Sequence, residues 1–291
     1  MYMVTLICNP EKAALDPHLV ENLRSAWGGG AVTWLSVGEA AEFQVAQKPD
    51  TFESVWHDVQ ATGVDLVILP AQNRRKRILI ADMDSTMIRQ ECIDELADEA
   101  GVGARVADIT ARAMNGELDF NAALTERVGL LAGLDAAIID HVLATRITHM
   151  PGGAVLLATM KASGAYCALV SGGFTAFTAA VGGALGFDEN RANTLLVADG
   201  KLTGQVGHPI LGKQAKVDAL NDITARLGLS ADDAIAVGDG ANDLGMLTLA
   251  GTGVGLHAKP AVQAQCDVRV NHGDLSALLF VQGYSRADFV V

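Results

Sequence analysis

The sequence predicts an α/β protein with a Rossmann-like parallel sheet, an inserted helical cap and a small N-terminal α+β domain. Two observations predict this class. From residue 77 onward, short apolar runs alternate with helical patterns, as in a parallel sheet covered by helices. Between the first two runs, residues 88–148 show helical patterns without a convincing strand, which indicates a cap inserted over the sheet.

The predicted N-terminal domain comprises residues 1–73. It carries apolar strand patterns and helix patterns, with strands expected at 3–7, 32–37 and 65–69 and helices near 16–26 and 51–62. The basic stretch at 73–77 is too short and isolated to be a nucleic-acid patch, so we interpret it as a solvated junction. The second domain then comprises residues 77–291.

Five apolar runs predict the strands of the second domain, at 77–82, 165–170, 234–238, 252–256 and 267–270. The first three runs are almost continuously apolar, as expected for strands covered on both faces. The cap pattern divides into four helices, expected at 88–100, 103–115, 119–132 and 135–146. An Asp-Gly pair within residues 195–204 predicts a β-hairpin.

Composition and charge narrow the class of protein. Half of the 291 residues are hydrophobic and 19% are charged, which allows a sizeable core. The formal net charge of -13 argues against a general nucleic-acid or anionic-membrane binder, so we expect neither partner. No apolar run reaches the roughly 18 residues of a membrane span, and no secretory signal is visible. Four scattered cysteines without CxxC spacing indicate reduced thiols in a cytoplasmic protein.

Four polar segments lie at or just after the ends of predicted strands, or at the start of a helix. They are Asp82-Met83-Asp84-Ser85-Thr86, Ser171-Gly172-Gly173, a lysine at 213 or 216, and Gly238-Asp239-Gly240-Ala241-Asn242-Asp243. Each segment alone could be an ordinary structural feature, such as a tight turn or a solvated helix residue. Because the carboxyl ends of parallel strands open onto one crevice, we expect the four segments to meet there.

Such a meeting would bring four carboxylates together with one ammonium, one hydroxyl and several backbone amides. The carboxylates need a counter-ion, and Mg²⁺ is the natural partner beside a phosphate. The lysine, the serine and the amides would form a phosphate cradle. One aspartate could attack phosphorus while the second, two residues on, served as general acid and base. Strand alternation sends Asp82 and Asp84 to the same side if the strand continues unbroken.

At these four motifs the chain resembles the haloacid dehalogenase superfamily of phosphatases. Asp82-x-Asp84-x-Thr86, Ser171-Gly172-Gly173, the lysine and the glycine-flanked Asp239 segment match its four motifs in order. Three cap segments, 88–95, 113–120 and 124–128, resemble the cap of the phosphoserine phosphatases within it. The resemblance covers about residues 77–285 and implies the same fold, with a parallel core and a helical cap.

The resemblance also implies a role for each matched residue. Asp82 would be the phosphorylated nucleophile and Asp84 the acid and base. Mg²⁺ would be bound by the Asp82 carboxylate, the Asp84 backbone carbonyl and Asp239, with support from Asp243. The phosphate would be bound by Ser171, Gly172, Gly173, Asn242 and the lysine.

In the cap, the resemblance implies that Glu91 pairs with the substrate ammonium and Arg127 with its carboxylate. Met114 and Phe120 would close over the bound amino acid. An anion, a guanidinium fork and a phosphate site together suit O-phospho-L-serine, which carries an amine, a carboxylate and a phosphate. Positions 120 and 127 lie two helical turns apart, so both side chains can point into one pocket.

Two assignments stay open at this point. Lys213 and Lys216 compete for the third motif, and the spacing of Lys216 from Asp239 and Leu220 favours Lys216. The N-terminal domain resembles the ACT-like extensions of bacterial family members, but no motif in it matches residue by residue. Whether it binds an amino acid, mediates a homodimer or only packs against the rest of the chain is not decided by the sequence.

The resemblance implies a Mg²⁺-dependent phosphatase that converts O-phospho-L-serine to L-serine and phosphate through an aspartyl-phosphate, the last step of serine biosynthesis. One alternative is the same chemistry on another small phosphomonoester, such as phosphothreonine or phosphoglycolate. Glu91 and Arg127 favour an amino-acid phosphate. A non-enzymatic regulator that binds an amino acid is a second alternative, and the complete catalytic set argues against it.

Overall fold

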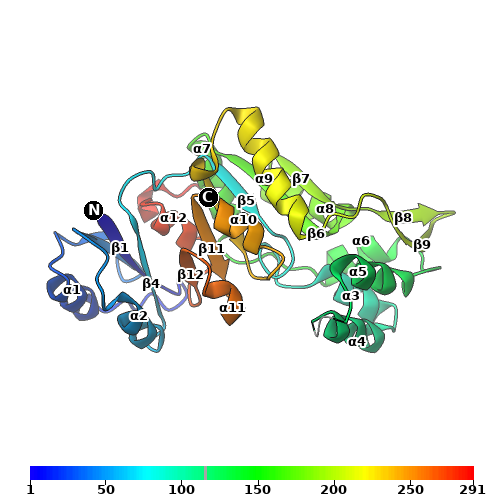
Figure 1. The fold of residues 1–291 in the computed structure, drawn as a ribbon, viewed down its shortest axis with the longest axis horizontal. Helices are drawn as coiled ribbons and strands as arrows, with labels where there is room; N and C mark the ends of the chain where they lie inside the picture. The colour runs from blue at the N-terminus through cyan, green and yellow to red at the C-terminus, as the bar shows by residue number, and fades with distance from the viewer. Residues whose placement is uncertain (115–116) are drawn as a thin grey trace.

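The computed structural model describes residues 1–114 and 117–291, without the side chains of residues 113 and 114. Three regions follow one another along the long axis of the molecule (Figure 1). The N-terminal α+β domain lies at one end, a parallel sheet with its helices occupies the centre, and the helical cap lies at the other end. The predicted α/β class with a parallel sheet and an inserted cap is confirmed.

The N-terminal domain has the element order β-α-β-β-α-β. Its elements are β1 Tyr2–Cys8, α1 Pro17–Ala26, β2 Thr33–Ser36, β3 Ala40–Val45, α2 Phe52–Gln60 and β4 Val64–Pro70. They form an antiparallel sheet of order β2-β3-β1-β4. This is the ferredoxin-like arrangement of two interleaved βαβ units. The sequence prediction missed β3, whose first two residues are alanines.

Both faces of the N-terminal sheet are buried. Because successive side chains of a strand alternate between faces, Val4 and Leu6 pack in one core with Phe43 and Trp56. Ile7 and other residues of the opposite face join the core of the central sheet domain, which also contains α12 Ala277–Val281. The two sheets therefore share buried apolar surface.

Polar contacts also join the two domains. The carboxylate of Asp65, at the start of β4, is fully buried. It accepts hydrogen bonds of 2.8–3.2 Å from the backbone N–H groups of Asn271, His272 and Gly273. These amides belong to the loop that follows the last strand of the central sheet, so Asp65 fixes that loop to the N-terminal domain.

The expectation of a solvated junction at 73–77 is wrong for two of its residues. Arg74 forms an ion pair of 2.7 Å with Glu42, and both side chains are largely buried. Lys76 is 8% exposed, and its ammonium donates a hydrogen bond of 2.8 Å to the carbonyl of Asp232. Their long side chains turn back onto the adjacent domains, because the aliphatic stems can be buried while the charged ends find polar partners.

The central sheet is parallel, with the strand order β12-β11-β10-β5-β6-β7. Its strands are β5 Ile78–Ala81, β6 Tyr166–Phe174, β7 Glu189–Asn193, β10 Ala234–Gly238, β11 Thr252–Leu256 and β12 Val268–Val270. All five predicted strands are present. The sequence Glu-Asn-Arg-Ala-Asn of β7 lies at the edge of the sheet and lacks the apolar run on which the prediction depended.

Helices cover the sheet and form the cap. The helices of the central domain are α7 Gly153–Ala162, α8 Thr175–Leu185, α9 Lys213–Leu227, α10 Leu244–Leu249, α11 Pro260–Gln263 and α12. The cap consists of α3 Cys92–Glu99, α4 Gly103–Met114, α5 Phe120–Gly129 and α6 Ile138–Thr145, as predicted. The predicted hairpin is formed by β8 Leu195–Ala198 and β9 Lys201–Val206, which lie beside α5 (Figure 1). Within the described residues, no helix is both long and apolar enough to cross a membrane.

Candidate active site

The first motif begins where β5 ends. The Asp82 N–H donates to the carbonyl of Val237 on β10, so the backbone of Asp82 is still fixed by the neighbouring strand. The chain then turns, because the N–H groups of Thr86, Met87 and Ile88 all donate to the carbonyl of Met83. The strand does not continue unbroken, as we had supposed in predicting a shared direction. This turn, and not strand alternation, brings Asp82 and Asp84 to the same cavity.

The second motif lies within β6, where the pairing with β7 shifts register between Val170 and Phe174. The Ser171 hydroxyl accepts a hydrogen bond of 2.8 Å from the N–H of Gly173 and lies 3.4 Å from Oδ2 of Asp84. A Cβ atom at Gly173 would lie 2.7 Å from Asp84 Oδ2. Only glycine therefore leaves room for the Asp84 carboxylate beside this strand.

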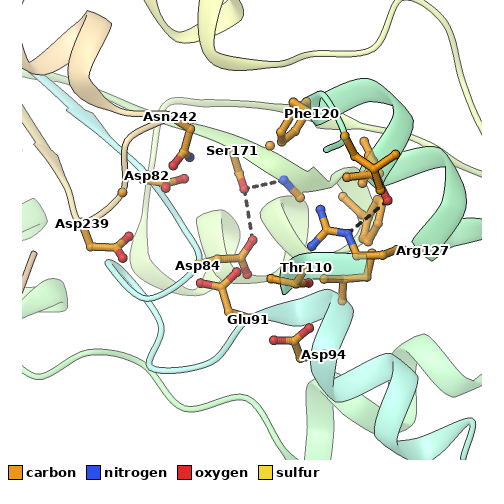
Figure 2. Close-up of a pocket in the computed structure, with 18 of the residues that line it drawn as sticks. Asp82, Asp84, Glu91, Asp94, Thr110, Phe120, Arg127, Ser171, Asp239 and Asn242 are labelled. Carbon is orange, nitrogen blue, oxygen red and sulfur yellow. Dashed lines mark hydrogen bonds between the residues drawn. The ribbon is translucent and has the colours of Figure 1, made fainter. Parts of the chain in front are cut away.

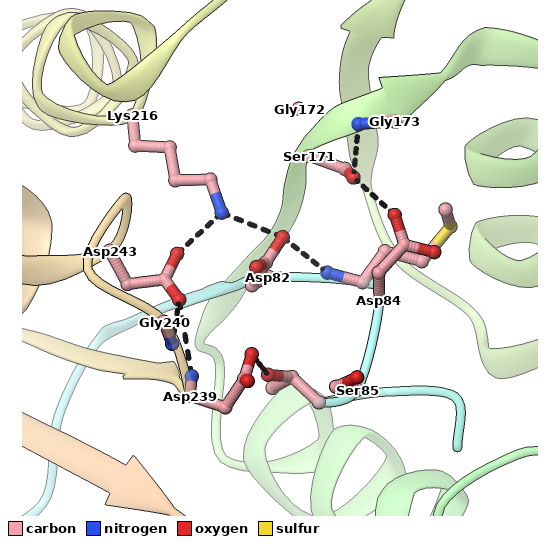
Figure 3. Close-up of polar contacts among 12 residues, drawn as sticks. Asp82, Asp84, Ser85, Ser171, Gly172, Gly173, Lys216, Asp239, Gly240 and Asp243 are labelled. Atoms are coloured by element: carbon pink, nitrogen blue, oxygen red, sulfur yellow. Dashed lines mark hydrogen bonds and ion pairs between the residues drawn. The ribbon is translucent and has the colours of Figure 1, made fainter. Parts of the chain in front are cut away.

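The third and fourth motifs meet beside Asp82 (Figure 3). The ammonium of Lys216, on the first turn of α9, lies 2.7 Å from Asp82 Oδ1 and 2.5 Å from Asp243 Oδ1. The other oxygen of Asp243 accepts hydrogen bonds from the N–H groups of Asp239 and Gly240. Lys216 is 2% exposed and Asp243 is fully buried. Lys213, one turn earlier on α9, is exposed and does not share the buried position of Lys216.

The carboxylates beside Lys216 carry more negative charge than one ammonium can balance. Burial and the charge of Asp243 raise the pKa of Asp82, although Lys216 opposes the rise. The same two causes raise the pKa of Asp239 to about 6. Single oxygen atoms of Asp82, Asp239 and Asp243 all lie within 4.8 Å of one another. Three carboxylates at this spacing fit a hard divalent cation, which would neutralise their charge.

Asp84 lies on the other side of the site from Lys216 (Figure 3). Its Oδ1 accepts a hydrogen bond of 3.0 Å from the N–H of Cys92, the first residue of α3. Burial raises the pKa of Asp84 in spite of this bond. This raised pKa suits Asp84 to hold a proton next to a ligand.

Above the sheet, the cap contributes the carboxyl groups of Glu91 and Asp94 and the guanidinium of Arg127 to the cavity. Glu91 accepts a hydrogen bond of 2.7 Å from the Ser85 hydroxyl. Solvent reaches Glu91 through the open cavity, yet desolvation by the surrounding protein and the charge of Asp84 raise its pKa to about 7. Burial lowers the pKa of Arg127, and the carboxylate of Asp94 opposes this effect. The Arg127 Nε–H donates to the Ala123 carbonyl one turn earlier, at 3.3 Å.

A cavity of about 460 Å³ lies between the carboxyl edge of the sheet and the cap. Figure 2 shows Asp82, Asp84 and Asp239 on the sheet side and Phe120 and Arg127 on the cap side. Ten of the predicted site residues line this cavity: Asp82, Asp84, Glu91, Phe120, Arg127, Ser171, Gly172, Gly173, Asp239 and Asn242. Residues of the first, second and fourth motifs and residues of the cap therefore line one cavity.

Three predicted site residues are not part of the cavity wall. Lys216 and Asp243 contact Asp82 and are buried away from the wall. The side chain of Met114 lies outside the described residues.

Sequence reasoning missed other residues that line the cavity, among them Asp94, Thr110 and Lys259. Lys259 could have been found, because it follows β11 at the same edge of the sheet as the four motifs. Asp94 lies one turn after Glu91 on α3 and could have been found by helical spacing. Thr110 lies in a helix with no distinctive pattern, and only the packing of α4 against α3 and α5 places it at the cavity.

Comparisons with known proteins show the family of this chain. The model of the haloacid dehalogenase-like hydrolase family matches residues 79–248, more than half of the chain. A phosphoserine phosphatase of Streptomyces coelicolor is 42% identical over 79% of this chain and 57% of its own length. The chain thus spans little more than half the length of that relative.

Two further proteins match along almost the whole chain. A probable phosphoserine phosphatase of Schizosaccharomyces pombe is 40% identical over 92% of this chain and 91% of its own length. The unliganded crystal structure of a probable phosphoserine phosphatase from Vibrio cholerae has a TM-score of 0.80 at 32% identity, covering 99% of this chain and 88% of that one. The resemblance carried by the four motifs is therefore confirmed, and the chain belongs to the haloacid dehalogenase-like hydrolase family.

Proposed function

We propose that this protein is a Mg²⁺-dependent phosphatase that hydrolyses O-phospho-L-serine to L-serine and inorganic phosphate. The observation that carries the proposal is the pair of aspartates in one cavity with opposite surroundings. Asp82 lies against the ammonium of Lys216, which opposes the rise of its pKa caused by burial and by Asp243, whereas Asp84 lies away from Lys216 and has its pKa raised by burial. A nucleophile and a general acid require this difference.

In the first step, a carboxylate oxygen of Asp82 attacks the phosphorus in line with the leaving serine oxygen. The bond between phosphorus and the serine oxygen breaks, and Asp84 donates its proton to that oxygen. Within the described residues, both polar contacts of Asp82, from the Met83 N–H and from Lys216, go to Oδ1. This leaves Oδ2 as the attacking atom.

In the second step, the Asp84 carboxylate takes a proton from a water molecule as the water oxygen attacks the phosphorus of the aspartyl-phosphate. The bond between Asp82 and phosphorus breaks, which releases inorganic phosphate and restores the Asp82 carboxylate. We expect Ser171 and the backbone of Gly172 and Gly173, which line the cavity, to bind the phosphate oxygens, and the Gly173 N–H must then turn from the Ser171 hydroxyl to the phosphate. Preorganised donors of this kind stabilise the charge that develops on the transferring group.

Asp82 and Asp239 would hold the metal ion, with Asp243 within reach and the Asp84 backbone carbonyl as a further oxygen ligand. A bound Mg²⁺ supplies positive charge that neutralises the phosphate oxygens and the carboxylate cluster. Lys216 orients Asp82 and favours its ionised form against the effect of burial. Its contact with the phosphate, which the family resemblance implies, would be made once the phosphoryl group is on Asp82.

The cap supports an amino-acid phosphate as the substrate. Glu91 and Arg127 line the same cavity as Asp82, so an ammonium and a carboxylate can each meet an opposite charge while phosphate lies at the sheet edge. The relative from Streptomyces coelicolor is named phosphoserine phosphatase, and the relative from Schizosaccharomyces pombe is named probable phosphoserine phosphatase. We place the reaction in the cytoplasm, since all four cysteines carry free thiols.

Phosphate release tests this proposal. The purified protein should release phosphate from O-phospho-L-serine in the presence of Mg²⁺, with a higher kcat/KM than from phosphothreonine, phosphoglycolate or p-nitrophenyl phosphate. Chelation of divalent cations should abolish release, and added Mg²⁺ should restore it. A preference for phosphoglycolate would contradict the roles of Glu91 and Arg127, and no release from any phosphomonoester would contradict the whole proposal.

A further inference from the structure

One residue in the wall of the cavity carries a buried hydroxyl group that has no partner among the described residues. The side-chain oxygen of Thr110, on α4, is buried and makes no hydrogen bond within the part of the chain that the structure describes. Thr110 lines the same cavity as Glu91 and Arg127. In Figure 2 it lies between these two residues on the cap side of the cavity.

Other helical threonines of this protein show what Thr110 does differently. Four of them donate their hydroxyl proton to the backbone carbonyl one turn earlier, at 2.7–2.9 Å: Thr125, Thr145, Thr224 and Thr248. This bond is the usual way in which a helix satisfies a threonine hydroxyl. The Thr110 hydroxyl does not make this bond, although a buried hydroxyl without a partner lowers the free energy of unfolding by about 1–3 kcal/mol.

The charges around Thr110 indicate the chemistry of the missing partner. Arg127 is partly buried, and its pKa is lowered by desolvation although the carboxylate of Asp94 opposes this effect, so its guanidinium can bind an anion in the cavity. A carboxylate offers about four lone-pair positions, and a guanidinium fork occupies two of them. A neutral hydroxyl donor of a residue that lines the same cavity as Arg127 can therefore bind the same carboxylate without competing for a position.

We propose that the Thr110 hydroxyl donates a hydrogen bond to the α-carboxylate of the substrate that Arg127 also binds, and so contributes to selection of an amino-acid phosphate. The inference rests on the proposed function, because it names a contact to the amino-acid part of that substrate. Thr110 is then a specificity residue of the cap and takes no part in phosphoryl transfer.

The test compares Thr110→Val, which removes the hydroxyl at nearly constant shape, with Thr110→Ser, which keeps it. O-phospho-L-serine and O-phosphoethanolamine are each measured as competitors of p-nitrophenyl phosphate hydrolysis. Phosphoethanolamine keeps the ammonium and the phosphate but lacks the carboxylate. Thr125→Val is the matched control in the same cap, because that hydroxyl is exposed and bonds its own helix.

Thr110→Val should weaken inhibition by phosphoserine about five- to tenfold, as expected for one lost hydrogen bond to a charged group. It should leave inhibition by phosphoethanolamine and the hydrolysis of p-nitrophenyl phosphate unchanged. Thr110→Ser and Thr125→Val should both behave like the wild type. An equal loss for both competitors, or unaltered inhibition by phosphoserine in Thr110→Val, would overturn the inference.

The same assay separates this inference from the proposed function. If phosphoserine competes through Thr110 but is not hydrolysed by the wild-type protein, the contact stands and the phosphatase assignment fails. If phosphoserine is hydrolysed but the Thr110→Val variant binds it normally, the assignment stands and the contact is wrong.

Discussion

The ammonium of Lys216 lies 2.7 Å from Oδ1 of Asp82 and 2.5 Å from Oδ1 of Asp243, and water reaches almost none of the three side chains. A buried ammonium normally loses its proton easily, because burial lowers its pKa. The two adjacent carboxylates outweigh that effect here and raise the pKa of Lys216. Asp82 therefore has a permanent cation on one side and an open cavity on the other.

Replacing Lys216 should disable the site. Lys216→Met removes the cation that orients Asp82 and favours its ionised form, and we expect kcat/KM for phosphoserine to fall at least about 100-fold, as for other preorganised electrostatic groups. Lys213→Met, one turn earlier on an exposed position, is the matched control and should keep wild-type activity. Circular dichroism checks that both variants fold. Equal activities of the two folded variants would contradict the assignment of Lys216.

Replacing Arg127 should affect recognition more than chemistry. Arg127→Ala removes the guanidinium that faces the substrate carboxylate, so KM for phosphoserine should rise roughly 10- to 100-fold, while KM for p-nitrophenyl phosphate stays near the wild-type value. Arg112→Ala is a suitable control, because that partly exposed arginine of the same cap pairs with Glu126 instead of lining the cavity. Loss of activity on both substrates in Arg127→Ala would argue for a structural role.

The raised pKa of Glu91, about 7, predicts how substrate preference depends on pH. Below this pH the carboxyl group is protonated and neutral, so it loses its attraction for the substrate ammonium. The ratio of kcat/KM for phosphoserine to kcat/KM for p-nitrophenyl phosphate should therefore fall as the pH drops through 7. In Glu91→Gln the ratio should be low and independent of pH. A wild-type ratio that stays constant between pH 6 and pH 8 would contradict this role.

Asp65 should stabilise the junction between the two sheets. Asp65→Ala leaves the buried N–H groups of Asn271, His272 and Gly273 without their acceptor, and we expect the free energy of unfolding to fall by about 3 kcal/mol. Asp58→Ala, at an exposed position of α2, should change it by less than about 0.5 kcal/mol. Urea denaturation measures both values, and similar midpoints for the two variants would show that Asp65 is not an anchor.

The sequence predicted the central sheet well, because strands such as β5 and β10 are continuous apolar runs that end in polar motifs. It missed β7, an edge strand whose polar residues carry no apolar pattern. The four helices of the cap were recognisable from periodicity alone. The burial of Arg74 and Lys76 was missed, because a basic stretch does not reveal which partners its long side chains reach.

Site residues could be predicted from the sequence where they lie at the ends of strands. Asp82, Ser171 and Asp239 were found by this rule and line one cavity. Lys213 and Lys216 lie one helical turn apart, and only the packing of α9 shows which of them contacts Asp82. Thr110 could not be found from the sequence, since its relevant property is a hydroxyl that does not bond to its own helix.

Acid quenching of the protein during turnover of O-phospho-L-serine labelled in its phosphate tests the central claim most directly. The account predicts that the label is bound to the protein as an acyl-phosphate on Asp82, that hydroxylamine releases it, and that Asp82→Asn neither binds label nor turns over. A wild-type protein that turns over without binding label, or label that persists on folded Asp82→Asn, would contradict the assignment of Asp82 as the nucleophile.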